Sequence, residues 1–172
     1  MGHPGWLSVR HRMVALLLAS QKCVLVEVFA EEGCPYCPTA LAAAEWLDTA
    51  YADTVAVIQY IYPNLFNGSW RLSYYGISGY PTAWIDGVFE EVGGSSGDTE
   101  AVYNRYKNDV GYRAYIQPVL SVYVDSAEVE GDSAFVAARV RLDVGMSYQS
   151  PKVFAALTHA HQWNDWRWNR FK

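Results

Sequence analysis

The Cys-Pro-Tyr-Cys sequence at residues 34–37 is the feature that most restricts what this chain can fold into. A mostly apolar run at residues 23–30 precedes it, and an amphipathic stretch at residues 38–51 follows. This order predicts a strand, a short loop and a helix, with the cysteine pair at the helix N-terminus. Unpaired N–H groups and the helix dipole stabilise a thiolate at that place, so we expect Cys34 to be a reactive nucleophile.

A second motif follows at residues 77–87, which read Ile-Ser-Gly-Tyr-Pro-Thr-Ala-Trp-Ile-Asp-Gly. The pattern predicts a loop ending at Pro81, a strand, and a turn at residues 86–87. Together the two motifs resemble the thioredoxin superfamily over about residues 23–117. The resemblance implies an α/β, thioredoxin-like fold, with a central mixed sheet flanked by helices. It also implies that Pro81 is a cis proline facing the cysteine pair, and that the Tyr80 backbone pairs with a substrate peptide.

The same resemblance implies the chemistry. Cys34 would attack a substrate disulfide and Cys37 would resolve the mixed disulfide, with no cofactor beyond the redox-active pair itself. Glu27 is a charge within the apolar strand. In thioredoxins a buried acid at this place helps the resolving cysteine lose its proton, although the register matches only with one extra residue in the loop at 31–33. The alternative is an ordinary strand acid, paired with a nearby lysine or reaching solvent.

Other interpretations of the cysteines stay open at this point. Pro35 and Tyr36 match the dipeptide of glutaredoxins, and they are candidate substrate-binding residues. The pair could instead be a structural disulfide or half of a zinc site, but zinc needs two more ligands and the sequence has no second Cys-x-x-Cys. We therefore predict no metal. Cys23 is expected to be an inert, buried thiol in the central strand.

The rest of the chain predicts two parts, a thioredoxin-like domain at 1–117 and an antiparallel β extension at 118–172. The extension resembles the beginning of a β-sandwich. Helices are expected at 9–20, 38–51, 69–75 and after Asp98, and strands at 23–30, 55–61, 82–85, 88–91, 119–124, 134–144 and 151–158.

The composition limits the classes of binding partner that we expect. The net charge is −5 and no block of basic residues occurs, which argues against nucleic-acid binding. The apolar runs are too short to span a bilayer. Residues 10–20 have the look of a short signal peptide, with a packed helix as the alternative, so an extracytoplasmic location is slightly favoured. The tryptophan-rich segment at 163–171 is interpreted as covering an apolar surface. The alternatives are an interfacial membrane segment or a homodimer contact, and the β extension could form a homodimer contact too.

The sequence thus predicts a thiol–disulfide oxidoreductase that acts on protein thiols and disulfides. One alternative is a secreted binding scaffold with a vestigial redox domain, and another is a glutathione-dependent, glutaredoxin-like reductase. The direction of the redox chemistry depends on the reduction potential of the pair, which the sequence does not fix.

Overall fold

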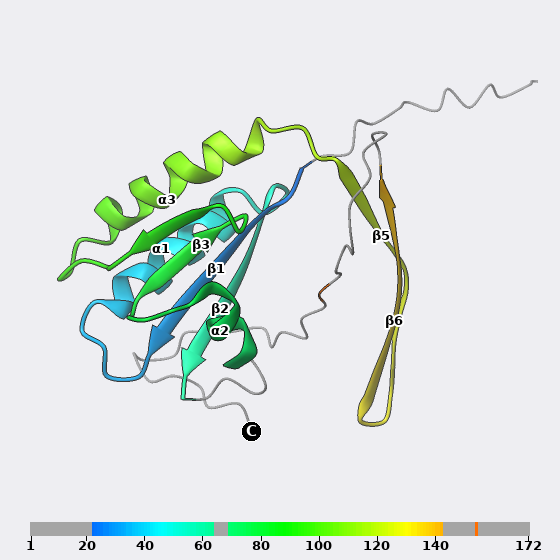
Figure 1. Cartoon of the computed structure of the whole chain (residues 1–172), viewed down its shortest axis with the longest axis horizontal. Helices are drawn as coiled ribbons and strands as arrows, with labels where there is room; N and C mark the ends of the chain where they lie inside the picture. The colour runs from blue at the N-terminus through cyan, green and yellow to red at the C-terminus, as the bar shows by residue number, and fades with distance from the viewer. Residues whose placement is uncertain (1–21, 64–68, 143–153, 155–172) are drawn as a thin grey trace, which may run out of the picture.

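The computed structural model describes residues 22–63, 69–142 and 154, which form a β-α-β-α-β-β-α unit followed by a β-hairpin (Figure 1). The elements are β1 (Val24–Glu31), α1 (Cys37–Ala50), β2 (Val55–Tyr62), α2 (Ser69–Tyr75), β3 (Thr82–Ile85), β4 (Phe89–Val92), α3 (Thr99–Ala114), β5 (Leu120–Glu130) and β6 (Ser133–Leu142). None of the described helices combines the length and apolar character needed to cross a membrane.

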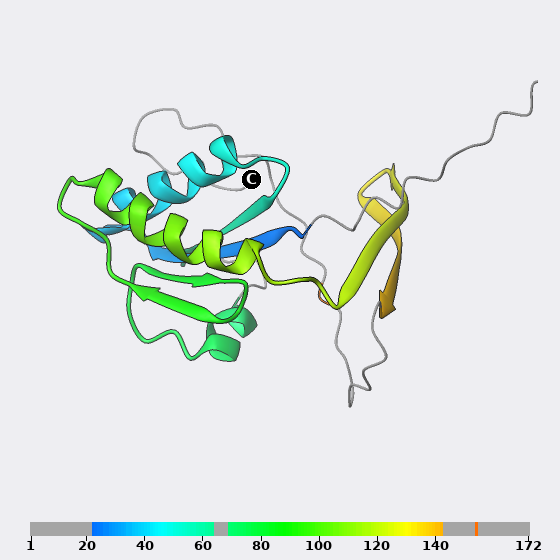
Figure 2. The same cartoon turned by 90° about the horizontal axis from the view of Figure 1, so that it is seen from above.

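The first four strands make one mixed sheet in the order β2-β1-β3-β4. β1 is parallel to β2 and antiparallel to β3, and β3 is antiparallel to β4. Helices α1 and α3 cover one face of this sheet, and α2 lies on the other (Figure 2). The predicted fold class, a thioredoxin-like mixed sheet flanked by helices and followed by antiparallel β structure, is therefore confirmed.

The two faces of β1 bury different kinds of side chain. Val26 and Val28 point into an apolar core that α1 and α3 complete, whereas Phe29 stacks on Tyr60 of β2 on the opposite face. This alternation follows from the two-residue period of a strand. Because both faces are covered, β1 is almost wholly buried, as its apolar sequence predicts.

Local signals in the sequence set several boundaries. Asp86 and Gly87 have φ of 56° and 66°, the left-handed backbone of a tight hairpin turn, and they join β3 to β4. The side chain of Asp98 accepts a hydrogen bond from the Ala101 N–H at 2.9 Å and caps α3, as expected. The predicted helix at 69–75 is also present as α2.

The antiparallel hairpin formed by β5 and β6 is a separate two-stranded sheet. Of the expected third strand at 151–158, the structure describes Phe154, which is not in a strand. Its ring stacks on Trp70 of α2, with 5.2 Å between ring centroids. The expected helix at 9–20 and the tryptophan-rich segment at 163–171 lie outside the described residues.

One expectation about the core is wrong. Cys23 is exposed, because it precedes β1 instead of lying within it. Burial of the strand begins at the next residue, Val24. The apolar run in the sequence therefore extends one residue beyond the segment that the helices cover.

Candidate redox site

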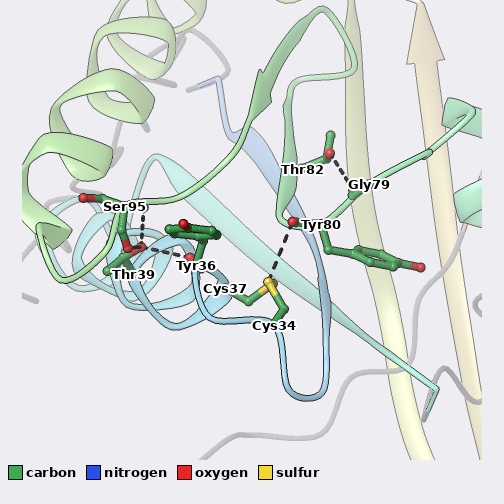
Figure 3. Close-up of a disulfide and its surroundings, with 8 residues drawn as sticks. All are labelled: Cys34, Tyr36, Cys37, Thr39, Gly79, Tyr80, Thr82 and Ser95. Carbon is green, nitrogen blue, oxygen red and sulfur yellow. Dashed lines mark hydrogen bonds between the residues drawn. A yellow bond between two sulfur atoms is a disulfide. The ribbon is translucent and has the colours of Figure 1, made fainter.

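Cys34 and Cys37 form a disulfide at the N-terminus of α1, with their Cα atoms 5.5 Å apart (Figure 3). Cys37 is the first residue of the helix, and Cys34 lies in the loop just before it. The first turn carries no acidic residue, and Tyr36 at the N-cap makes no side-chain capping hydrogen bond. The positive end of the helix dipole therefore faces the sulfur atoms without a competing carboxylate from the first turn.

The two cysteines differ in accessibility. Cys34 is half-buried, whereas Cys37 is completely buried among the apolar residues of the core. Thiol–disulfide exchange requires an in-line approach to one sulfur atom. An incoming thiolate can therefore reach the disulfide at Cys34, and a thiolate on Cys37 can reach Cys34 from within the protein.

The loop before β3 lies against Cys34. The carbonyl oxygen of Tyr80 is 3.7 Å from Cys34 Sγ (Figure 3), and the peptide bond between Tyr80 and Pro81 is cis. Pro81 itself is buried, and its carbonyl accepts a hydrogen bond from the Gly93 N–H at 2.8 Å. The structure thus brings Tyr80 and Pro81, which the sequence resemblance pointed to, next to the cysteine pair.

A second loop holds the beginning of α1, and sequence reasoning missed it. The Thr39 hydroxyl lies 2.9 Å from the Tyr36 carbonyl and 3.0 Å from the Ser95 carbonyl, and it accepts a hydrogen bond from the Ser95 N–H at 2.9 Å (Figure 3). Gly94 packs so closely that an added Cβ would collide with the Tyr36 carbonyl oxygen. The glycine-rich sequence of the loop at 93–97 was the one signal of this contact, since glycine permits close approach of two backbones.

Glu27 does not join the cysteines. Its side chain is buried on the opposite face of the sheet, where Arg71 of α2 binds it through Nε and Nη2 at 2.7 and 2.6 Å. The hydroxyls of Tyr60 and Tyr75 donate to the same carboxylate at 3.0 and 2.7 Å. The neighbours of Glu27 in β1, Val26 and Val28, face the core that contains Cys37. The carboxylate is therefore engaged in an ion pair with an arginine, and the two interpretations of this residue from the sequence both miss Arg71.

Exposed aromatic side chains belong to segments that adjoin the disulfide. Tyr36 is 49% exposed beside the disulfide, and Pro35 next to it is also exposed. Tyr62, at the end of β2, stacks on the Tyr80 ring with 6.2 Å between centroids and is 45% exposed. The Tyr62–Tyr80 stack therefore adjoins the loop whose Tyr80 carbonyl contacts Cys34.

Cys23 does not belong to this site. Although the Cys23 side chain is exposed, neighbouring atoms remove part of the hydration of its thiol, and this effect together with the nearby Asp86 carboxylate raises its pKa and disfavours the thiolate. Among the described residues, no three histidine, cysteine, aspartate or glutamate side chains gather as a metal site would require.

No family model matches the chain, and a search of curated proteins finds no match. Similar solved structures include HBP35 of Porphyromonas gingivalis, which is 25% identical over 60% of this chain and 37% of that chain, with a TM-score of 0.42. The germline-specific thioredoxin Deadhead from Drosophila melanogaster is 16% identical over 52% of this chain and 84% of its own, with a TM-score of 0.38. The chain therefore spans well under two thirds of the HBP35 length. Independently of these similarities, a disulfide at the N-terminus of α1 with one accessible sulfur is suited to thiol–disulfide exchange.

Proposed function

We propose that this chain is a thiol–disulfide oxidoreductase that exchanges disulfides with protein substrates through Cys34 and Cys37. The observation that carries the proposal is the asymmetric disulfide at the start of α1, in which Cys34 is accessible and Cys37 is completely buried. A purely structural disulfide does not require one accessible sulfur atom at a helix N-terminus. It also does not require the Tyr80 carbonyl to lie beside that sulfur.

In the reducing direction, the Cys34 thiolate attacks one sulfur of a substrate disulfide. A Cys34–substrate bond forms, the substrate disulfide breaks, and one substrate thiolate leaves. The Cys37 thiolate then attacks Cys34 Sγ, re-forms the disulfide seen in the structure and releases the second substrate thiolate. The substrate gains two electrons and the protein loses two. The reverse sequence oxidises a dithiol.

The surroundings of Cys34 favour a peptide as the substrate. The Tyr80 carbonyl lies 3.7 Å from Cys34 Sγ, so an extended peptide whose cysteine is bonded to Cys34 would run past this backbone. The exposed rings of Tyr36 and Tyr62 would cover apolar side chains that flank the substrate cysteine. Tyr80, Tyr36 and Pro35 are therefore proposed as substrate contacts.

Reduction of insulin disulfides by the full chain, with dithiothreitol as the electron donor, tests the proposal. We expect turnover by the unaltered protein and by Cys23→Ser, which is the matched control. Cys34→Ser should abolish turnover. Cys37→Ser should slow it strongly, because the internal resolving thiol is lost. When the reduced variant is mixed with insulin after dithiothreitol has been removed, it should accumulate a mixed disulfide on Cys34 that mass spectrometry detects.

The outcomes also separate the alternatives. Turnover that requires glutathione would identify a glutaredoxin-like reductase, and a folded protein that forms no adduct and shows no turnover would indicate a vestigial redox domain. The equilibrium reduction potential of the Cys34–Cys37 pair in a glutathione buffer would give the direction of the redox reaction. Known reductases lie at about −270 mV and strong oxidases at about −120 mV.

A further inference from the structure

The β5–β6 hairpin has one entirely apolar face. Cross-strand pairs in the register share a face, and every second pair consists of two apolar residues. This set, called the apolar face below, comprises Leu120, Val122, Val124, Ala127 and Val129 of β5 and Ala134, Val136, Ala138, Val140 and Leu142 of β6. A bulge at Asp125 shifts the register between Val124 and Ser126, and it keeps the later apolar residues of β5 on the same face as the earlier ones.

The opposite face of the hairpin is mostly polar, although it also carries Phe135 and Ala137 of β6. It carries an ion pair between Arg139 and Asp125, with a closest N–O distance of 2.7 Å, and Arg139 and Arg141 both lie over the ring of Tyr123. Glu128 lies on the same face further along β5. The hairpin therefore has one entirely apolar face and one face on which all the charged side chains lie.

The apolar face is exposed in the described structure. Val122, Val124 and Val136 are about two thirds exposed, and Val129 is 79% exposed. The contacts of β5 and β6 are chiefly with each other rather than with the elements of the first sheet. A two-stranded hairpin alone is marginally stable in water, and three or more strands or a packed face are needed to hold one. Another apolar surface must therefore cover this face.

We propose that the apolar face packs against the same face of a second copy of this chain, as two sheets of a sandwich. The face carries no charge on any of its ten side chains, so two copies meet without like-charge repulsion. Its exposed fractions correspond to an area on the order of 700 Å² per copy, close to the ~800 Å² per partner of a standard protein interface.

Phe154 is not the residue that covers the apolar face, because its ring contacts Trp70 and Tyr74 of α2. A two-fold axis relating two hairpins makes the contact closed and isologous, which limits the assembly to a dimer. The two faces would lie ~10 Å apart, the usual separation of packed sheets.

Sedimentation velocity of the full chain over a wide concentration range tests this. We expect a monomer–dimer equilibrium, and Val124→Glu should raise the dimer dissociation constant by roughly 100-fold or more, because two carboxylates would be buried unpaired. The matched control is Ser126→Glu, which places the same charge two residues away on the polar face and should leave the dissociation constant within about 3-fold. Insulin reduction by both variants should stay unchanged and shows that the first sheet is folded.

Amide hydrogen exchange of β5 and β6 shows whether a second copy or another part of the same chain covers the apolar face. A dimer predicts that protection of these amides falls on dilution, in step with dissociation. Protection that does not depend on concentration, with a monomer throughout, would mean that another part of this chain covers the face, and would overturn the proposal. A monomer with unprotected hairpin amides at every concentration would overturn it as well, and would indicate a different partner.

Discussion

Gly94 offers the sharpest test of how the start of α1 is held. A Cβ built at this position collides with the carbonyl oxygen of Tyr36 and lies 2.8 Å from the Thr39 hydroxyl. The nearest atom is the backbone carbonyl oxygen of Tyr36, between the two cysteines, so it cannot rotate away as the end of a flexible side chain would. Gly94→Ala should therefore push the loop at 93–95 away from the helix and break the hydrogen bonds between Thr39 and Ser95.

The expected cost is set by two opposing effects. Overpacking of a closely packed site typically costs ~1–3 kcal/mol, and loss of hydrogen bonds to Thr39 adds about 1 kcal/mol. Reduced freedom of the unfolded chain returns about 0.4–1 kcal/mol. We expect a net loss of about 1–3.5 kcal/mol in the free energy of unfolding, measured by urea denaturation at constant m-value. Insulin reduction should also slow, because the loop contacts the segment between Cys34 and Cys37.

Gly111→Ala is the matched control. Gly111 lies inside α3, and a Cβ there meets no atom within 4 Å. The same chemical change should therefore stabilise the protein by about 0.5–1 kcal/mol, through helix propensity alone. The close packing that we describe at Gly94 would be refuted if the two alanine variants unfolded at the same urea concentration.

Three further predictions concern charge and reactivity. Iodoacetamide at mildly acidic pH should label Cys34 of the reduced protein before Cys23, because partial desolvation and a nearby carboxylate raise the pKa of the Cys23 thiol. Peptide mass mapping measures the two labelling rates, and faster labelling of Cys23 would contradict this prediction. Arg71→Met should destabilise the protein by about 3–5 kcal/mol in urea denaturation, because it leaves the Glu27 carboxylate buried without its ion-pair partner. Adding Glu27→Gln to this variant should recover part of the lost stability. Equal stability of the single and double variants would argue against a stabilising Arg71–Glu27 ion pair. Partial burial and a neighbouring carboxylate raise the pKa of Glu45 from 4.5 to about 7, so the folded state binds the extra proton and stability should fall as pH rises through that window. Glu45→Gln should therefore gain stability relative to the unaltered protein between about pH 5 and about pH 8, and parallel pH profiles of the two proteins would rule this out.

Features with a local cause could be predicted from the sequence. The N-cap at Asp98, the turn at residues 86–87 and the buried stripe of Val102, Tyr106 and Val110 on α3 all depend on residues within one or two turns of each other. The strand before the cysteine pair and the helix after it follow in the same way from hydrophobic periodicity. These elements are sufficient to place Cys34 and Cys37 at a helix N-terminus.

Features that depend on contacts between residues far apart in the chain could not be predicted from the sequence. Arg71 lies 44 residues after Glu27 in the sequence, and nothing near either residue indicates that α2 will cover that face of β1. The contact of Gly94 with Tyr36 likewise joins two loops that meet only after the sheet has formed. Hydropathy alone places Cys23 in the core, because it does not show where the helices stop covering a strand.

The bulge in β5 has a consequence for how the length of this chain can change over time. Asp125 is the one residue of β5 that has no opposite residue in β6, and without it ten residues would face ten in strict alternation. A deletion of this single residue would therefore leave every neighbouring side chain on its present face, at the cost of the carboxylate that Arg139 binds. A deletion at Tyr123 without compensation would instead turn part of the strand over. One-residue length variation among descendants of this sequence is thus expected to collect at Asp125.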